Sequence, residues 1–298
     1  MRKTVFAMAA PVLVIVALAG CGSSSSSSSS STTTASTGGA NAALAAEVPA
    51  AIKSKGTLTV ASDATYAPNE FIAPDGHTVI GMDVDLMDAI GAQMGLKVKF
   101  VNATFDTIIP GLAAGKYDLG SSSFTDTKER EKTVEFVDYF SAGISFYAKT
   151  SASPAVSTVA DLCGKNVAVE KGTVEQEEAE AQSKKCTKVG KQAVKVLSFP
   201  DQNGANLALS SGRAELGMAD SPIAEYQVKQ SSGAFKLIGQ PYEVAPYGLA
   251  IPKSSGLSKP ILAALKAIIA NGEYNKVLAK WGLQSGAISS PKIDGATG

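Results

Sequence analysis

Segments with strand and helix character alternate through the chain from about residue 57 onward. Residues 57–61 and 96–101 alternate apolar and polar side chains, and the segment that Asp83 can cap places Leu86 and Ile90 on one helix face. Further strands are predicted at residues 118–119, 166–169, 194–199, 215–219, 235–238 and 248–251. Further helices are predicted at residues 107–114, 127–134, 173–184, 261–269 and 273–281. This order predicts an α/β fold with a mostly parallel sheet, whose ligands bind beyond the carboxyl ends of the strands.

Length and composition exclude several classes of function. The 298 residues predict two domains or lobes at about 150 residues each. Lys+Arg and Asp+Glu number 27 each, so no basic excess exists for binding nucleic acid. His77 is the one histidine, which argues against a multi-histidine metal site and leaves one base for any Ser/His/Asp triad. The usual glycine-rich phosphate loops are absent from the sequence.

The N-terminus predicts export and lipid anchoring. Two basic residues precede an apolar stretch at residues 5–17, which is too short for a transmembrane span and is typical of a signal peptide at residues 1–20. Residues 17–19 would suit ordinary signal peptidase, whereas residues 18–21 favour a lipobox in which Cys21 is diacylated. Nine serines follow at residues 23–31, and we expect a flexible, lipidated tether over residues 21–51.

The other two cysteines, Cys163 and Cys186, lie 23 positions apart. In an exported protein an even number of cysteines favours a disulfide, and the alternative is two unpaired buried thiols. A bridge here closes a loop whose entropy contribution is about 3 kcal/mol.

A run of hydroxyl side chains leads into a charged segment that begins at residue 128. An arginine, free hydroxyls and unpaired helix N–H groups can together hold a carboxylate, which makes Arg130 a candidate. The alternative is that residues 128–132 form a solvated helix face, and the pattern alone favours that alternative. The hydroxyl residues of this run are Ser122, Ser123, Thr125 and Thr127.

Two aspartates follow predicted strands. Asp220 comes directly after residues 215–219 and is either a helix N-cap, which spacing alone favours, or a carboxylate at a strand end. Asp63 follows the first strand in the same way, with Tyr66 and Phe105 as stacking surfaces or ordinary core residues.

Motifs spread over residues 57–282 resemble, in order and spacing, the solute-binding proteins of bacterial polar amino-acid ABC transporters. The first half carries ASDATYAP at residues 61–68, GMDVDL at 81–86, FDTIIP at 105–110, SFTD at 123–126 and ER at 129–130. The second half carries VAV at residues 167–169, GT at 172–173, ADSP at 219–222, YG at 247–248, NGEY at 271–274 and KW at 280–281.

This resemblance implies a periplasmic-binding-protein-like type II clamp, in which two α/β lobes are joined by two hinge strands. Lobe 1 would comprise residues 52–142 and 246–298, and lobe 2 residues 143–245. The hinge segments would lie near residues 141–145 and 245–248. A ligand that bridges the lobes would stabilise the closed form, and the transporter would recognise that form.

The resemblance also implies roles for single residues. Arg130 would pair with the α-carboxylate of an amino acid, and Asp220 would bind its α-ammonium. Asp63 would contact the side chain of the ligand and select it by its polarity. Aromatic rings would sandwich that side chain, and hydroxyl groups would assist Arg130. The candidate ligand-binding residues are Asp63, Tyr66, Phe105, Ser122, Ser123, Thr125, Arg130, Glu170, Thr173 and Asp220.

Departures from the family pattern bear on the ligand. Asn69 stands where the family often has an aromatic residue. Glu170 stands where glutamine binders have a lysine and some basic amino-acid binders have an apolar residue. Two carboxylates, from Asp63 and Glu170, predict a basic amino acid, with arginine ahead of lysine or ornithine. Glu175 lies one turn beyond, and we expect Lys171 to point away. In the competing interpretation Glu170 faces solvent and Asp63 binds the amide of glutamine or asparagine.

The predicted function is extracytoplasmic capture of a polar amino acid by a lipid-anchored monomer and delivery to an ABC permease, without cofactor, metal or catalysis. One alternative is an exported enzyme on the same fold, such as a cyclohexadienyl dehydratase, with Asp63 or Glu170 as the acid. Another is a sensor or adhesin lipoprotein that does not bind amino acids.

Overall fold

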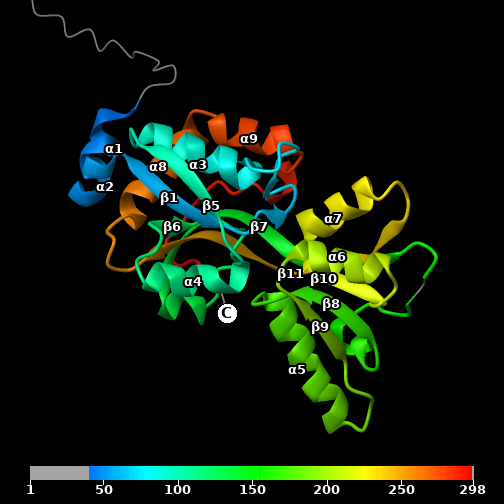
Figure 1. Ribbon diagram of the computed structural model, residues 1–298. Helices are drawn as coiled ribbons and strands as arrows, with labels where there is room; N and C mark the ends of the chain where they lie inside the picture. The colour runs from blue at the N-terminus through cyan, green and yellow to red at the C-terminus, as the bar shows by residue number, and fades with distance from the viewer. Residues whose placement is uncertain (1–39, 153, 297–298) are drawn as a thin grey trace, which may run out of the picture. The chain divides into compact units, whose positions relative to one another are not determined.

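The computed structural model describes residues 40–152 and 154–296. The predicted signal peptide, Cys21 and the serine run lie outside the described residues. An eight-stranded sheet with the order β5-β1-β6-β11-β7-β10-β8-β9 forms the centre of the described part (Figure 1). Its strands are β1 (Thr57–Ser62), β5 (Lys97–Asn102), β6 (Leu119–Gly120), β7 (Val134–Lys149), β8 (Asn166–Glu170), β9 (Lys195–Phe199), β10 (Leu216–Asp220) and β11 (Phe235–Pro252).

The two long central strands, β7 and β11, run antiparallel to each other from the Phe235–Lys149 pair to the Pro252–Val134 pair. Parallel strands flank them on both sides, with β1 between β5 and β6 in one half and β8 between β10 and β9 in the other. The prediction of a mostly parallel sheet is therefore wrong at the centre. Only the two ends of β11 were predicted as strands, because residues 239–247 do not alternate apolar and polar side chains. In the structure the pairing register of β11 with β7 shifts three times along the strand.

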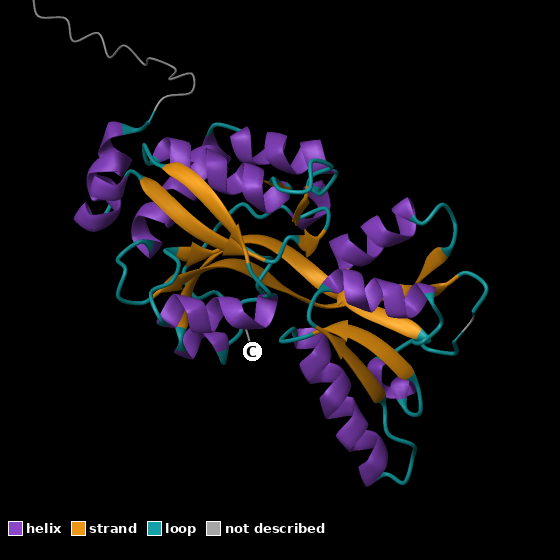
Figure 2. Cartoon of the chain, viewed as in Figure 1, coloured by secondary structure: helices purple, strands orange, loops and turns teal. Residues whose placement is uncertain are grey.

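Helices cover both faces of each half of the sheet (Figure 2). Leu58 of β1 and Leu265 of α8 belong to the larger apolar core, and Phe146 of β7 and Val167 of β8 belong to a second core. A small sheet of β2 (Thr65–Tyr66), β3 (Glu70–Ile72) and β4 (Val79–Ile80) adjoins the first half. The helices of the first half are α3 (Met82–Gln93), α4 (Phe105–Ala113), α8 (Ser258–Ala270) and α9 (Glu273–Trp281). Those of the second half are α5 (Val174–Lys188), α6 (Gln202–Ser210) and α7 (Ser221–Gln230).

Two short helices precede β1, where a tether was expected as far as residue 51. These are α1 (Ala42–Glu47) and α2 (Ala50–Lys55), and the side chains of Leu44 and Val48 are buried in the larger core. Asn41 donates its backbone N–H to the Gln93 carbonyl oxygen at 3.0 Å. The tether prediction is therefore wrong for residues 42–51, because two apolar side chains in an alanine-rich segment suffice to dock it on the fold.

The charged helix predicted at residues 127–134 is also wrong. Only the 3₁₀ turn η1 (Arg130–Lys132) is helical there, and two further 3₁₀ turns are η2 (Val159–Leu162) and η3 (Gln284–Gly286). The predicted disulfide between Cys163 and Cys186 is confirmed, and it joins the segment after η2 to the C-terminal part of α5. Over residues 40–152 and 154–296, no helix is both long enough and apolar enough to cross a membrane.

Candidate functional site

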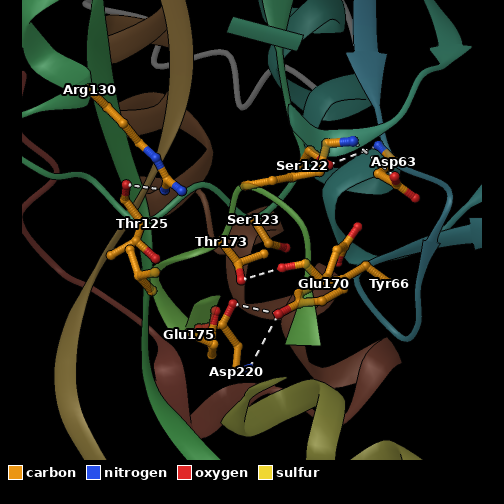
Figure 3. Close-up of a pocket in the computed structure, with 12 residues that line it drawn as sticks. Asp63, Tyr66, Ser122, Ser123, Thr125, Arg130, Glu170, Thr173, Glu175 and Asp220 are labelled. Atoms are coloured by element: carbon orange, nitrogen blue, oxygen red, sulfur yellow. Dashed lines mark hydrogen bonds between the residues drawn. The ribbon is translucent and has the colours of Figure 1, made fainter. Parts of the chain in front are cut away.

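A pocket of about 280 Å³ lies between the two halves of the sheet (Figure 3). A few polar groups from different elements converge on it beside aromatic and apolar side chains, which is typical of a small-molecule site. All ten candidate residues from the sequence line this pocket, together with two more, Val174 and Glu175. The complete lining is Asp63, Tyr66, Phe105, Ser122, Ser123, Thr125, Arg130, Glu170, Thr173, Val174, Glu175 and Asp220.

Strand ends bring most of the polar lining together. Asp63 directly follows β1, and Ser122 lies two residues beyond its parallel neighbour β6. Glu170 and Asp220 are the last residues of β8 and β10, which are parallel neighbours in the other half. The carboxyl ends of parallel strands meet at one edge of a sheet, which explains why residues far apart in the sequence share the pocket.

Arg130 is held by the backbones of both halves. Its Nη1 donates to the Thr125 carbonyl oxygen and its Nη2 to the Gly172 carbonyl oxygen, each at 2.9 Å. The guanidinium carbon lies 5.4 Å from the ring centroid of Phe105 and 5.8 Å from that of Phe124. Burial lowers the pKa of Arg130. The solvated-face alternative for this residue is wrong, since the guanidinium lines the pocket.

Asp220 occupies the N-cap position of α7, but its side chain makes no capping hydrogen bond. Its Oδ2 accepts a hydrogen bond from the Tyr66 hydroxyl at 2.9 Å, and its backbone N–H donates to the same hydroxyl oxygen at 3.2 Å. Burial raises the pKa of Asp220 to about 6, against hydrogen bonds and the Arg130 charge that lower it. The carboxylate is thus turned into the pocket and not toward its own helix.

Asp63 is fixed by hydrogen bonds to the protein. Its Oδ1 accepts from the Thr65 hydroxyl at 2.6 Å, and its Oδ2 accepts from the Phe105 N–H at 3.0 Å. Its own backbone N–H donates to the Ser122 hydroxyl oxygen at 2.9 Å. Burial raises the pKa of this carboxyl group. The side chain is therefore held in one orientation before any ligand arrives.

A buried layer of polar groups supports the two serines of the lining. The Ser122 hydroxyl donates to Glu70 Oε1 at 3.2 Å, and the Ser123 hydroxyl donates to Glu70 Oε2 at 3.1 Å. Asn69 Nδ2 donates to the Ser123 hydroxyl oxygen at 2.9 Å, so the residue that departs from the family pattern positions a residue of the pocket lining.

Two glutamates of the pocket have buried oxygen atoms without a hydrogen-bond partner. Glu170 and Glu175 are each 2% exposed, and Oε1 of each is unpaired. Burial, followed by the charge of a neighbouring aspartate, raises the pKa of both carboxyl groups well above the ordinary range. Buried polar atoms normally have partners, so these two oxygens are suited to a bound ligand. Lys171 cannot offset them, because its Nζ pairs with Asp106 Oδ2 at 2.7 Å.

The charge balance of the pocket is therefore acidic. Four of the lining residues carry carboxyl groups, namely Asp63, Glu170, Glu175 and Asp220, whereas Arg130 is the one cation among them. Such a set favours a ligand with more positive than negative charge. Within the described residues, no group of three or more His, Cys, Asp or Glu side chains is arranged to hold a metal ion.

The profile of the bacterial extracellular solute-binding proteins, family 3, matches residues 58–284 of the chain. The chain belongs to this family. Within it, the solute-binding protein is similar to the arginine-binding protein ArgT of Corynebacterium glutamicum, with 33% identity over 250 residues that cover 84% of this chain and 82% of ArgT. It is also similar to the ABC transporter arginine-binding protein 1 of Escherichia coli, with 31% identity over 73% of this chain and 87% of the relative.

Solved structures agree with the bilobed fold of this solute-binding protein. An ancestral arginine-binding protein bound to arginine has a TM-score of 0.70 and 35% identity, covering 76% of this chain and 98% of that one. An ancestral arginine-binding protein bound to glutamine has a TM-score of 0.70 and 34% identity, covering 76% of this chain and 98% of that one. The ancestral amino-acid-binding protein AncCDT-1, a precursor of cyclohexadienyl dehydratase, has a TM-score of 0.70 and 33% identity, covering 78% of this chain and 97% of that one.

Sequence reasoning left out Val174 as a lining residue of this solute-binding protein, and it named Glu175 only as a neighbour of Glu170 and not among the candidate ligand-binding residues. Acidic residues in the first turn of a helix ordinarily stabilise its positive end, so Glu175 carried no separate signal. The position of Thr173 could have indicated both residues. Thr173 is the N-cap of α5, and its side chain accepts from the Gln176 N–H at 3.3 Å. Since the helix begins at the pocket, its first turn lies there too.

Proposed function

We propose that this protein captures a basic amino acid, arginine above all, outside the cell membrane and delivers it to an ABC permease. Membership of the solute-binding family and the transporter names of its relatives support the carrier role. The acidic pocket supports the ligand class, and the unpaired Glu170 Oε1 is the observation that carries it. A basic side chain would supply the cation that this oxygen lacks.

The α-groups of the ligand would bind to Arg130 and Asp220, which come from different halves of the fold. The guanidinium of Arg130 would pair with the α-carboxylate, assisted by hydroxyls of the pocket lining. Asp220, held by the Tyr66 hydroxyl, would bind the α-ammonium. A zwitterion needs one fixed cation and one fixed anion in a dry site, and this pocket provides both.

The side chain of the ligand would extend toward Asp63 and Glu170. Burial and then the Asp63 charge raise the pKa of Glu170, so a guanidinium placed between the two carboxyl groups would relieve their repulsion. Arginine can meet two carboxyl groups at once with its planar fork, whereas lysine presents a point charge. The ring of Phe105 would add a cation–π contact of about 0.5–2 kcal/mol.

Closure of two lobes around the ligand would signal occupancy to the permease. We assign residues 52–142 and 246–298 to lobe 1 and residues 143–245 to lobe 2. On this assignment the contacts that cross between the lobes include Arg130 to Gly172, Tyr66 to Asp220, and the ion pair of Lys171 with Asp106. A ligand that adds contacts to both lobes would shift the population to the closed form.

A lipid on Cys21 would keep the carrier beside its permease. The segment between this cysteine and α1 would act as the tether. Replacement of Cys21 by serine should release the protein from the membrane without changing its ligand affinity. Retention of the Cys21→Ser variant on washed membranes would contradict the anchor.

A thermal-shift screen against the twenty amino acids, ornithine and citrulline tests the carrier proposal. A ligand at 100 times its dissociation constant stabilises a protein by about 2.7 kcal/mol, which the screen detects readily. We expect arginine to give the largest shift. No shift with any amino acid would overturn the proposal and favour a sensor or adhesin.

One observation favours an enzyme as the second candidate. A buried carboxyl group with a raised pKa, such as that of Glu170, is suited to act as a general acid on a leaving hydroxyl. AncCDT-1 is described as an amino-acid-binding protein that preceded such a dehydratase. Turnover of a cyclohexadienyl substrate would decide for the enzyme, and saturable binding without turnover decides for the carrier.

A further inference from the structure

Glu175 is a buried acid whose role the proposed α-group contacts do not explain. It is the second residue of α5, lines the pocket, and has an Oε1 without a hydrogen-bond partner. An isolated buried carboxyl group is costly, and a structural one normally has donors for both oxygens. The neighbouring Asp220 carboxyl group can pair with this oxygen only through a proton held between the two, because both groups are acceptors when ionised.

The neighbour of Glu175 is Asp220, at the same part of the pocket (Figure 3). Both residues belong to the second half of the fold. Strand β8, which leads into α5, pairs in parallel with β10, which ends at Asp220, through the register Leu216 to Val167. This carboxyl pair is therefore present whether or not the two lobes have closed, unlike the pair of Asp63 with Glu170.

Two adjacent buried carboxyl groups cannot both carry a charge at low cost, so the pair retains a proton. Burial and the Asp220 charge raise the pKa of Glu175 well above its usual value, and burial raises the pKa of Asp220 to about 6. The Arg130 charge opposes both shifts. Glu170 also interacts with the pair, since burial, the Asp63 charge and the Glu175 charge raise its pKa. The other titratable groups that face the pair are the hydroxyls of Tyr66, Tyr147, Tyr242 and Tyr247.

We propose that Glu175 and Asp220 together bind the α-ammonium of the ligand, and that the ammonium replaces the proton that the pair shares. The inference rests on the proposed binding of an amino acid by Asp220. The proton leaves to the solvent, the ammonium takes its place between the two carboxylates, and no covalent bond other than that O–H bond breaks. Because every amino acid carries an α-ammonium, the release does not depend on the ligand side chain.

Binding must then strengthen as the pH rises, since the free site holds one more proton than the occupied site. The dissociation constant should fall by up to about tenfold per pH unit until the free pair ionises, and then level off. A pair that served only to pack the protein would give no such dependence.

Titration calorimetry with arginine and with glutamine, in two buffers of different ionisation enthalpy at one pH near 6.5, counts the released protons. With either ligand the full-length protein should release about one proton more than Glu175→Gln releases, and Glu175→Gln should flatten the pH dependence. The matched control is Glu180→Gln, which removes an exposed carboxylate from the same helix and should behave as wild type. Asp220→Asn provides a second variant of the pair, should Glu175→Gln fail to fold.

The outcomes separate this inference from the proposed function. If wild type binds an amino acid without releasing a proton, or if Glu175→Gln releases as many protons as Glu180→Gln, the pair does not exchange a proton and the inference is wrong. If wild type binds no amino acid at all, the proposed function fails, and this inference fails with it.

Discussion

Arg130 and Gly172 are joined by a hydrogen bond of 2.9 Å, in which the Nη2 of the arginine donates to the glycine carbonyl oxygen. Arg130 belongs to the turn before β7, and Gly172 lies between β8 and α5 in the other half of the fold. The proposed cation for the ligand carboxylate is therefore also a contact between the two lobes. Ligand recognition and lobe closure involve the same side chain.

Replacing Arg130 by alanine should weaken ligand binding by about 2–5 kcal/mol, which is at least about 30-fold, because the ligand carboxylate is left buried and unpaired. Arg130→Lys should recover part of this loss, since lysine keeps the charge but not the planar fork. Titration calorimetry measures the ligand affinity of both variants. Arg213→Ala, at an exposed arginine that lies over the Phe199 ring, is the control. Affinity within a few-fold of wild type for Arg130→Ala would contradict the assignment.

Gly172 permits the close approach of the two lobes. It has a φ of +82°, and a β-carbon added there would lie 2.8 Å from the Asp106 β-carbon. Gly172→Ala should therefore hinder closure and weaken ligand affinity by at least about tenfold, or 1.4 kcal/mol. Gly190→Ala is a matched control, because its φ is +73° with no atom within 4 Å of the added carbon. Both variants lose about 1–2 kcal/mol of stability to backbone strain, and equal ligand affinities would contradict the prediction.

The strand ends show what the sequence can predict about the site. Asp63 and Asp220 were candidates because each follows an apolar strand, and parallel strands bring such positions together, although spacing alone favoured an N-cap role for Asp220. Glu170 was named only through the family pattern. Arg130 was not identifiable from pattern, since it lies in a charged run that looks solvated, and only the family motif indicated it. Glu175 lacked even that motif, because an acidic residue in a first helical turn has an ordinary explanation.

Long-range pairing accounts for the errors in the predicted fold. Residues 239–247 of β11 do not alternate, and they form a strand because β7 pairs with them across register shifts. Helices α1 and α2 have too few apolar residues to be predicted with confidence from one window, and their burial depends on a core formed by α3 and α8. The Cys163–Cys186 bridge was predictable, since export and an even cysteine count indicate a disulfide independently of the fold.

A cluster of acids under the C-terminal segment predicts how stability depends on pH. Asp138 adjoins Asp126, and burial together with the Asp126 charge raises the pKa of Asp138 to about 8. The folded state thus binds a proton that the unfolded state has lost above about pH 4, so the free energy of unfolding should fall as the pH rises from about 4 to about 8. Asp138→Asn should flatten this decline.

Thermal unfolding at pH 5 and pH 8 measures the effect of Asp138. The ligand-free variant should melt about 2–4 °C above wild type at pH 8, which corresponds to about 1 kcal/mol, and should differ less at pH 5. Glu225→Gln changes an exposed carboxylate on α7 and should leave the profile of wild type unchanged. A decline in Asp138→Asn as steep as that of wild type would be evidence against the cluster.

The disulfide should stabilise the second half of the fold. Replacing Cys163 and Cys186 together by serine should lower the free energy of unfolding by about 3 kcal/mol, because the 23-residue loop is no longer closed in the unfolded chain. Denaturant unfolding measures this loss of stability, and the wild-type protein with its disulfide reduced should show a similar loss. If the variant and oxidised wild type have the same midpoint, the bridge contributes nothing.

Competition calorimetry between arginine and glutamine tests the central claim most directly. The acidic pocket predicts that arginine binds at least about tenfold more tightly than glutamine, and that Glu170→Gln narrows the difference. Lysine and ornithine should fall between the two. Tighter binding of glutamine or glutamate than of arginine would contradict the account of a pocket built for a basic side chain.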